Sequence, residues 1–182
     1  QMILSDLEIE RRLLSKHLGI SNFRKEHLNP CSYDVTLNPE IAFYQDKTFD
    51  CKKEHLLAEP VILTDEGYEL QPGVLYLGHC NEYLKIPYNL KSTLSGKSSL
   101  GRLGLMIHLT AGFIDPGFEG SLVLELACIQ PIKIYPNMLI GQIEFEEVSG
   151  NIKNDYSLKS KSKYNKQKGN QASKYYLNFY GH

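Results

Sequence analysis

The 182 residues of this chain can bury one sizeable hydrophobic core, so the chain is most simply a single domain. Its 42% apolar and 23% charged residues are ordinary for a soluble globular protein. The formal net charge of -1 argues against a general nucleic-acid-binding protein, whose affinity rests on an excess of cations. The apolar runs fall well short of the ~20 residues that a membrane-spanning helix needs.

The cysteines are too far apart in the sequence for a zinc knuckle or a CxxC redox pair. They are Cys31, Cys51, Cys80 and Cys128. The sequence shows no signal peptide, so we expect free thiols in a reducing, cytoplasmic environment. Gln1 precedes a methionine, and we expect the natural chain to start at Met2.

A capping box predicts one short helix near the N-terminus. Ser5 stands at the N-cap position and Glu8 follows three residues later, where their side chains can satisfy free backbone N–H groups. Leucines then recur at near-helical spacing, at Leu7, Leu13, Leu14 and Leu18. We expect the helix to end at Gly19, in a left-handed conformation.

From Cys31 onward, short runs that alternate or are rich in β-branched residues predict strands. The clearest of these runs are residues 32–37, 74–77, 122–126, 132–135 and 139–145. Turn signals separate them, at residues 71–73, 115–117 and 135–137. Many short strands at this spacing indicate a sandwich or a barrel. Because unpaired strand edges need cover, such a domain also favours oligomerisation.

The segment after Gly150 differs in composition from the rest of the chain. Between Lys153 and Lys174 it has seven lysines and one acid, Asp155, and it ends in an aromatic run at residues 175–180. A solvated, disordered terminus is one interpretation. The other is a basic flap that closes on a polyphosphate and docks through its aromatic end.

A polar block in the middle of the chain has the residue types of an anion site. Within residues 96–102 the phosphate-binding candidates are Lys97, Ser98, Ser99 and Arg102, flanked by glycines. The block is not a Walker loop, which requires GxxxxGK[ST]. By itself it also fits a polar turn that carries surface cations.

Two carboxylates follow this block. Asp115 lies in an Asp-Pro-Gly turn, where an aspartate often bonds only local backbone but can also bind a sugar hydroxyl. Glu125 alternates with Leu124 and Leu126 in a strand, so it points to the face opposite to both leucines. It is either an exposed strand charge or a partly desolvated carboxyl, with a raised pKa, that moves protons.

The run from Ser98 to Leu126 resembles the dCTP deaminase family, relatives of the trimeric dUTPases, almost continuously. The resemblance extends over most of the chain, starts at residues 2–5, and is weakest between Tyr44 and Leu70.

This resemblance implies a mainly β fold. The expected form is a distorted jelly-roll or β-clip barrel like that of dUTPases, with a short N-terminal helix and a flexible C-terminal arm. It divides the chain into a nucleotide-binding domain over residues 2–150 and an arm over residues 151–182 that closes over the nucleotide. It also implies a homotrimer, or a hexamer of two trimers.

The resemblance further implies roles for individual residues. Ser98 and Arg102 would contact the phosphates and the reaction centre, and Asp115 the deoxyribose 3′-hydroxyl. Glu125 would be the general acid and base of deamination, while Ser98 and the carbonyl of Ala111 hold the attacking hydroxide. The substrate-binding set implied in this way is Lys97, Ser98, Ser99, Leu100, Gly101, Arg102, Asp115, Val123, Leu124, Glu125, Tyr156, Lys163 and Gln167. The last three match the spacing of the family's closing arm.

Zinc deaminases carry His-x-Glu and Pro-Cys-x-x-Cys motifs, and this sequence has neither. We therefore expect deamination without zinc, and Mg²⁺ only as the companion of the nucleotide triphosphate. We expect the lone His108 to be a satisfied core or interface residue rather than a metal ligand.

The residues Ala111-Gly112-Phe113 stand where deaminase-only relatives commonly have Ala-His-Arg, and they resemble the bifunctional members of the family. The leading interpretation is an enzyme that converts dCTP through dUTP to dUMP and pyrophosphate. Deamination alone and dUTP hydrolysis alone stay open, the latter disfavoured by Glu125, and a non-enzymatic nucleotide-binding trimer is the remaining alternative. dTTP is a candidate inhibitor, and the sequence leaves its effect open, as it does the choice between dCTP and dCMP.

Overall fold

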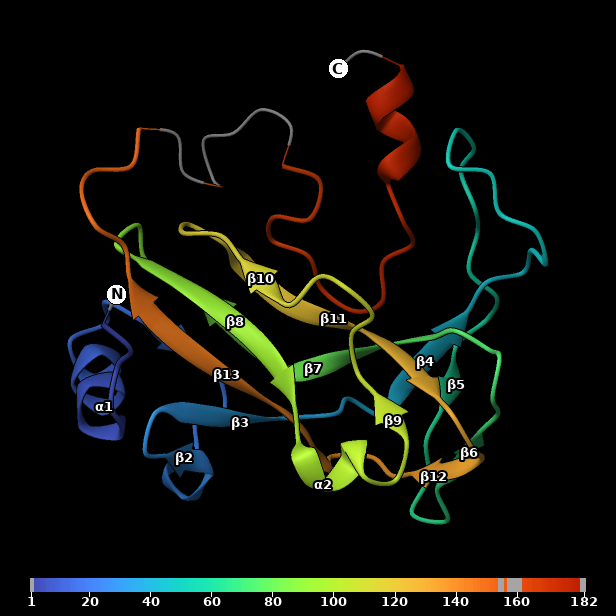
Figure 1. Ribbon diagram of the computed structural model, residues 1–182, viewed down its shortest axis with the longest axis horizontal. Coiled ribbons are helices and arrows are strands. Elements are labelled where there is room, and N and C mark those ends of the chain that lie inside the picture. The colour runs from blue at the N-terminus through green and yellow to red at the C-terminus, as the bar shows by residue number, and fades with distance from the viewer. Residues whose placement is uncertain (1, 154–155, 157–161, 181–182) are drawn as a thin grey trace.

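The computed structural model describes residues 2–153, 156 and 162–180, and within them the chain is mainly β, as predicted (Figure 1). The six-stranded sheet has the order β5 (Val61–Ile62), β4 (Glu40–Phe43), β7 (Tyr76–Lys85), β11 (Glu119–Cys128) and β9 (Leu105–Met106), with β1 (Gly19–Ile20) also paired to β7. The five-stranded sheet has the order β10 (Phe113–Ile114), β8 (Leu90–Gly96), β13 (Leu139–Glu147), β3 (Ser32–Thr36) and β2 (Leu28–Asn29). A separate ladder joins β12 (Ile132–Ile134) to β6 (Tyr68–Leu70).

The helical elements are short. They are α1 (Asp6–Leu14), η1 (Lys25–His27), α2 (Ser98–Gly101) and η2 (Tyr175–Phe179). No helix in the described part of the chain is long and apolar enough to cross a membrane. All four cysteines are free, as predicted, with Cys31 and Cys51 exposed and the other two buried.

The two large sheets contribute to one hydrophobic core. Leu124 and Leu126 of β11 and Ile143 and Phe145 of β13 are all completely buried within it. Burial of each such side chain contributes about 1.5–3 kcal/mol to folding. Across the described residues the strand ladders remain separate sheets, in a jelly-roll-like arrangement, and do not close into one barrel.

The five strands predicted from apolar alternation are all present, although β7 and β11 extend further than predicted. The strand β8, which contributes Leu94 to one of the cavities described below and Gly96 to the other, was not among them. Its inward-facing positions include Ser92, which is fully buried, so the apolar alternation that predicts a strand is interrupted. Pairing with β13 and β10 on its two sides fixes β8 instead.

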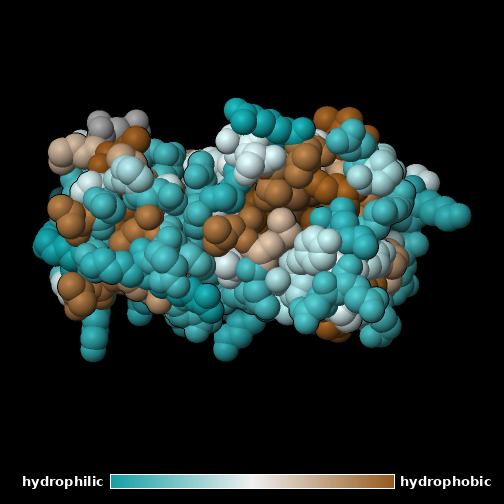
Figure 2. All heavy atoms as spheres, turned by 90° about the horizontal axis from the view of Figure 1, so that it is seen from below, coloured by the Kyte–Doolittle hydropathy of each residue, from teal (hydrophilic) through white to brown (hydrophobic). Residues whose placement is uncertain are grey.

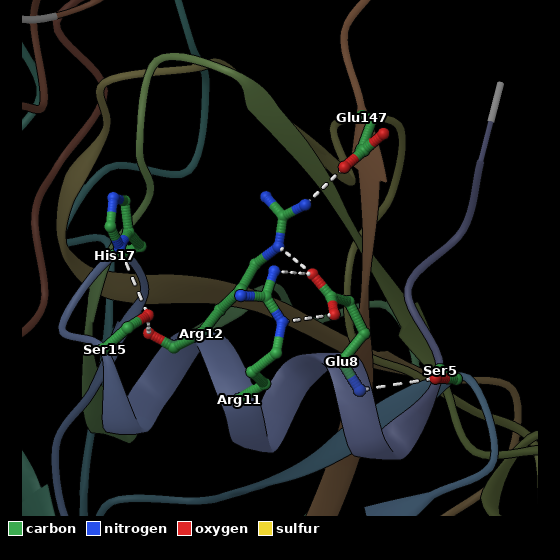
Figure 3. A network of polar contacts seen from close by, with 7 residues as sticks. All are labelled: Ser5, Glu8, Arg11, Arg12, Ser15, His17 and Glu147. Atoms are coloured by element: carbon green, nitrogen blue, oxygen red, sulfur yellow. Dashed lines mark hydrogen bonds and ion pairs between the residues drawn. The ribbon is translucent and has the colours of Figure 1, made fainter.

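The N-terminal helix starts as its sequence predicts (Figure 3). The Ser5 hydroxyl accepts a hydrogen bond from the Glu8 amide at 3.3 Å. The Glu8 carboxylate does not return to the cap; it accepts hydrogen bonds from Arg11 and Arg12, which lower the pKa of Glu8 to about 2, the Arg11 bond most strongly. Arg12 also pairs with Glu147 of β13, so the same network ties the helix to the five-stranded sheet.

The prediction that this helix ends at Gly19 is wrong. The helix ends at Leu14, and Lys16, with φ of 59°, takes the left-handed conformation. Gly19 starts β1, where a Cβ would lie 2.9 Å from the Cβ of Lys85 on β7. The glycine is therefore needed for the close approach of two strands and not for a helix cap.

Two irregular segments are important for the site. We call residues 44–60 the β4–β5 loop and residues 162–180 the C-terminal segment, which includes η2. In Figure 1 both stand above the same end of the six-stranded sheet, the loop in teal and the C-terminal segment in red. Asp155 of the predicted basic flap, and Gln1, lie outside the described residues.

Candidate active site

A cavity of about 500 Å³ lies between β11, the segment that leads into β10, and the C-terminal segment. It contains both carboxylates that the sequence singled out, together with apolar and aromatic side chains. Its polar and aromatic lining includes Tyr44, Thr110, Phe113, Asp115, Glu125, Tyr156, Tyr164, Gln167 and Ser173. Concave, largely apolar spaces with a few convergent polar groups are the usual form of small-molecule sites.

Glu125 enters the cavity because β11 alternates as predicted. Leu124 and Leu126 are completely buried on the core side, and half-buried Glu125 points the other way. Its Oε2 accepts a hydrogen bond from the Leu109 amide at 2.9 Å, and its own amide donates to the Ile107 carbonyl at 2.9 Å. These two bonds fix both the backbone and one carboxylate oxygen, and Oε1 has no hydrogen-bond partner among the described residues.

Asp115 lies in a turn, as predicted, and is exposed on the wall of the cavity. The Phe118 amide donates to the Asp115 carbonyl at 3.2 Å, and Gly117 has a φ of +82°. Tyr156 lies beside it: its amide donates to the Pro116 carbonyl at 2.9 Å. Burial raises the pKa of the Tyr156 phenol, and the negative charge of Asp115 raises it further. The uncharged phenol therefore remains available as a hydrogen-bond donor near Asp115.

The C-terminal segment closes one side of the cavity. The backbone carbonyl of Gln167 accepts a hydrogen bond from the Ser121 amide at 3.1 Å, and its side-chain Nε2 donates to the Ser121 carbonyl at 2.9 Å. A Cβ on Gly120 would lie 3.2 Å from the Gln167 amide nitrogen, so this glycine permits the approach. The Gln167 Oε1 is buried without a partner among the described residues. In its described part, the segment docks on β11 through Gln167.

Lys163 is not part of the cavity wall. Its Nζ donates to Asn178 Oδ1 at 2.6 Å and lies 5.4 Å from the centre of the Tyr175 ring. Of the three predicted arm residues, Tyr156 and Gln167 therefore line the cavity, whereas Lys163 stabilises the C-terminal segment internally.

The predicted phosphate-binding block lies in a second cavity, of about 430 Å³. This cavity is lined by Lys97, Ser98, Ser99 and Gly101, and its lining shares no residue with that of the first cavity. Arg102, the exposed C-cap residue of α2, lines neither cavity. Within a single chain, the predicted site is therefore divided in two.

Lys97 is held by a buried acid. Its Nζ donates to Asp34 Oδ2 at 2.6 Å, and Asn29 Nδ2 donates to the other oxygen of Asp34 at 3.0 Å. Asp34 is only 6% exposed, so this pair fixes Lys97 at the rim of the second cavity and offsets part of its charge.

Three sequence predictions need correction or refinement. The Leu124 side chain is completely buried in the core and lines neither cavity, which leaves only its backbone for a ligand contact, whereas Val123 lines the first cavity. Leu100 lines neither cavity and packs partly buried against the core. His108 is not satisfied within one chain, because its Nδ1 is buried without a hydrogen-bond partner among the described residues, and its role at an interface stays a prediction.

Three contributors to the first cavity were not predicted from the sequence. The Leu109 amide acts through the backbone, which no side-chain pattern reveals. Tyr44 comes from the stretch in which the family resemblance is weakest, so no motif marks it. Tyr164 was passed over, although it stands within the arm between two residues that were chosen for their spacing.

Comparison with known proteins identifies the family of this chain. The sequence profile of the dCTP deaminase-like family matches residues 3–148. A protein of Hathewaya histolytica named "dCTP deaminase, dUMP-forming" is 43% identical over 178 residues, which cover 98% of this chain and 99% of that protein. A protein of the same name from Cytophaga hutchinsonii is 42% identical over 178 residues, with the same coverage. The chain belongs to the dCTP deaminase-like family.

The fold is shared with a solved structure, the 2'-deoxycytidine 5'-triphosphate deaminase from Agrobacterium tumefaciens. The two superpose with a TM-score of 0.64 at 23% identity, over 84% of this chain. This chain spans half the length of that protein, since the match covers 50% of it.

Proposed function

We propose that this protein is a hydrolase that converts dCTP to dUMP, ammonia and pyrophosphate, with dUTP as the intermediate. The observation that carries the proposal is the Glu125 carboxylate, fixed by the Leu109 amide in a cavity that also contains Asp115. Relatives that are 43% and 42% identical over nearly their whole length carry the name of a dUMP-forming dCTP deaminase, which supports both the substrate and the product.

In the first reaction Glu125 moves protons. Its carboxylate takes a proton from water as the water oxygen bonds to C4 of cytosine, and it delivers that proton to N3. Collapse of the tetrahedral centre breaks the C4–N bond and releases ammonia, with a second proton passed through the same carboxyl group. The Leu109 amide holds one carboxylate oxygen throughout, so the other oxygen performs the transfers from a fixed position.

In the second reaction water attacks the α-phosphorus of dUTP, and the bond to the bridging oxygen breaks to release pyrophosphate. Asp115 binds the deoxyribose and holds the α-phosphorus in place for both substrates. Mg²⁺ enters with the triphosphate as part of the substrate and neutralises its charge. Tyr156, beside Asp115, is placed to donate a hydrogen bond to the same end of the ligand.

The complete site needs a second copy of the chain, in a homotrimer or a hexamer of two trimers. Glu125 and Ser98 line different cavities of one chain, yet the proposed chemistry uses both. Next to the Ser98 cavity, Met106, Leu103 and Ile129 are 40%, 53% and 75% exposed. The side of the molecule on which α2 and β9 lie carries apolar patches between hydrophilic ones (Figure 2). Packing of this side against a neighbour would cover them and bring Ser98 of one chain to Glu125 of the next.

Incubation of the protein with dCTP and Mg²⁺ tests the function, with ammonia release and phosphorus NMR as readouts. Stoichiometric ammonia, dUMP and pyrophosphate are expected, and dUTP supplied directly should be cleaved as well. Accumulation of intact dUTP would leave a deaminase alone, and cleavage of dUTP without turnover of dCTP would leave a dUTPase. Addition of dTTP to the same reaction tests its inhibition.

Mixing two inactive variants tests the shared site. Glu125→Gln and Ser98→Ala chains, unfolded together and refolded, should regain deamination, because a mixed oligomer has sites in which both residues are native. No recovery from a mixture that assembles normally would contradict a site shared between chains.

The four free cysteines fit our further proposal that the enzyme works in the reducing cytoplasm.

A further inference from the structure

The β4–β5 loop contacts the C-terminal segment at several points. The Tyr44 hydroxyl accepts a hydrogen bond from the Ser173 amide at 2.9 Å. Further out, the Tyr180 hydroxyl donates to the Lys52 carbonyl at 3.0 Å, and the Lys52 ammonium lies 5.5 Å from the centre of the Phe179 ring. The loop and the end of the chain, 128 residues apart in sequence at that contact, therefore hold each other directly.

The loop has an internal framework that supports these contacts. Tyr44 packs edge-on against Phe49 with ring centres 5.1 Å apart, and Phe49 packs against His55 at 5.0 Å. His55 Nδ1 is 2.7 Å from Asp46 Oδ2, and its Nε2 is 3.0 Å from both the amide nitrogen and the carbonyl oxygen of Asp50; in the protonated imidazole Nε2 donates to that carbonyl. A run of side chains thus leads from the polar base of the loop to the tyrosine that contacts the C-terminal segment.

Tyr44 belongs to the active-site cavity as well as to the loop. It lines the cavity together with Glu125 and with Tyr164 and Gln167 of the C-terminal segment. It lies close enough to Glu125 for that carboxylate to contribute to the raised pKa of the Tyr44 phenol, for which burial is the main cause. Tyr44 is therefore where the loop, the C-terminal segment and the cavity meet.

We propose that the β4–β5 loop is a docking platform that holds the C-terminal segment closed over the cavity, and that Tyr44 is the positioning residue that joins them. The platform retains the segment from outside, while Gln167 docks on β11 at the cavity itself. The kinetic part of this proposal rests on the proposed function; the docking part does not, because every contact named here exists without a nucleotide.

Two substitutions at Tyr44 distinguish the contribution of its hydroxyl group from that of its ring. Tyr44→Phe keeps the ring against Phe49 but removes the acceptor of the Ser173 amide, and Tyr44→Leu removes both. One neutral hydrogen bond favours the docked state by roughly 2- to 10-fold. Lys47→Ala, which changes an exposed side chain of the same loop, is the matched control.

Hydrogen exchange of peptides from the C-terminal segment, measured without nucleotide, is the first readout. In Tyr44→Phe the peptide that contains Ser173 should exchange roughly 2- to 10-fold faster than in the wild type, with a larger effect in Tyr44→Leu and none in Lys47→Ala. The second readout is dCTP turnover, where KM should rise by a similar factor in Tyr44→Phe. The value of kcat should change less, because phenylalanine keeps an aromatic ring at position 44 in the cavity that contains Glu125.

The two proposals fail in different ways. Unchanged exchange of this peptide in both Tyr44 variants would overturn the docking platform, whatever the protein does with dCTP. Faster exchange with an unchanged KM would overturn the positioning role of Tyr44. A wild-type protein that does not turn over dCTP would overturn the proposed function and leave the exchange result to decide the docking.

Discussion

Gly112→Ala is expected to damage both the stability and the activity of the protein. A Cβ built on Gly112 would lie 2.5 Å from the Leu94 carbonyl oxygen and 3.3 Å from His108 Nε2. The first contact is 0.9 Å short of the 3.4 Å at which ordinary contact begins, and the oxygen belongs to the backbone of β8, which cannot rotate away. The segment around Gly112 must therefore move away from β8, against the hydrogen bond of 2.8 Å from the Leu94 amide to the Gly112 carbonyl.

Overpacking of this kind costs roughly 1–3 kcal/mol. For a domain of this size each kcal/mol lowers Tm by roughly 2–4 °C, so a decrease of roughly 2–12 °C is expected. Leu109, three residues before Gly112, supplies the amide that holds Glu125. Displacement of that amide by a few tenths of an ångström should lower kcat for ammonia release at least ~10-fold, which corresponds to about 1.4 kcal/mol.

Thermal unfolding and a coupled ammonia assay measure the two effects. Gly96→Ala is the control for stability: Gly96 is the last residue of β8, its Cβ would meet only Ile107 Cγ1 at an ordinary 3.7 Å, and Tm should change little. A Gly112→Ala protein with the Tm and the kcat of the wild type would refute the steric argument. A lower Tm with unchanged kcat would refute only the link from this segment to Glu125.

Glu125→Gln should lower deamination at least ~10²-fold while dCTP still binds, because the amide keeps the shape but cannot move a proton; near wild-type ammonia release would exclude the role. Asp115→Asn should weaken both ammonia and pyrophosphate release, and a loss of only one would mean that the aspartate does not hold a sugar common to both steps. Treatment with a zinc-selective chelator, followed by Mg²⁺, should leave ammonia release unchanged, and activity that follows a stoichiometric zinc content would disprove zinc independence. The hydrogen bond to Asp46, and then that to the backbone of Asp50, raise the pKa of His55, so its protonated form stabilises the loop below the ordinary pKa of 6.5 and this contribution is lost as pH rises through the raised value. Over that window, exchange of the C-terminal segment, corrected for the intrinsic pH dependence, should accelerate in the wild type but not in His55→Asn.

The parts of this fold that the sequence predicted are those set by local pattern. In β11 Leu124 and Leu126 are inward, and Glu125 lies between them on the opposite face, so its direction followed from alternation alone. The turn at Asp115 followed from its own three residues. β8 could not be found in the same way, because its inward Ser92 is polar and the strand exists through its neighbours.

The arrangement of the site could be predicted only in part, because it depends on contacts between distant segments. Only the family resemblance predicts that residues 96–102 and Glu125 form one site. A single chain places them in separate cavities. Tyr44 enters the first cavity from a loop without a strand or helix pattern, and its partner Ser173 comes from the other end of the chain. No periodicity connects such residues, since the connection is made by the packing of the whole domain.

The position of Gly112 suggests a physical basis for the difference between one activity and two. Residues 109–115 begin at the amide that fixes Glu125 and end at Asp115, so one short segment sets the distance between the carboxylate proposed to transfer protons and the one proposed to bind the sugar. In this conformation the segment accepts no Cβ at Gly112, because the Leu94 carbonyl occupies that space. We therefore expect that a histidine at this position, as in the Ala-His-Arg form that the resemblance associates with deaminase-only members, requires a different path for the segment. We expect such a change of path to alter the placement of the α-phosphorus relative to C4, and with it the product that is released.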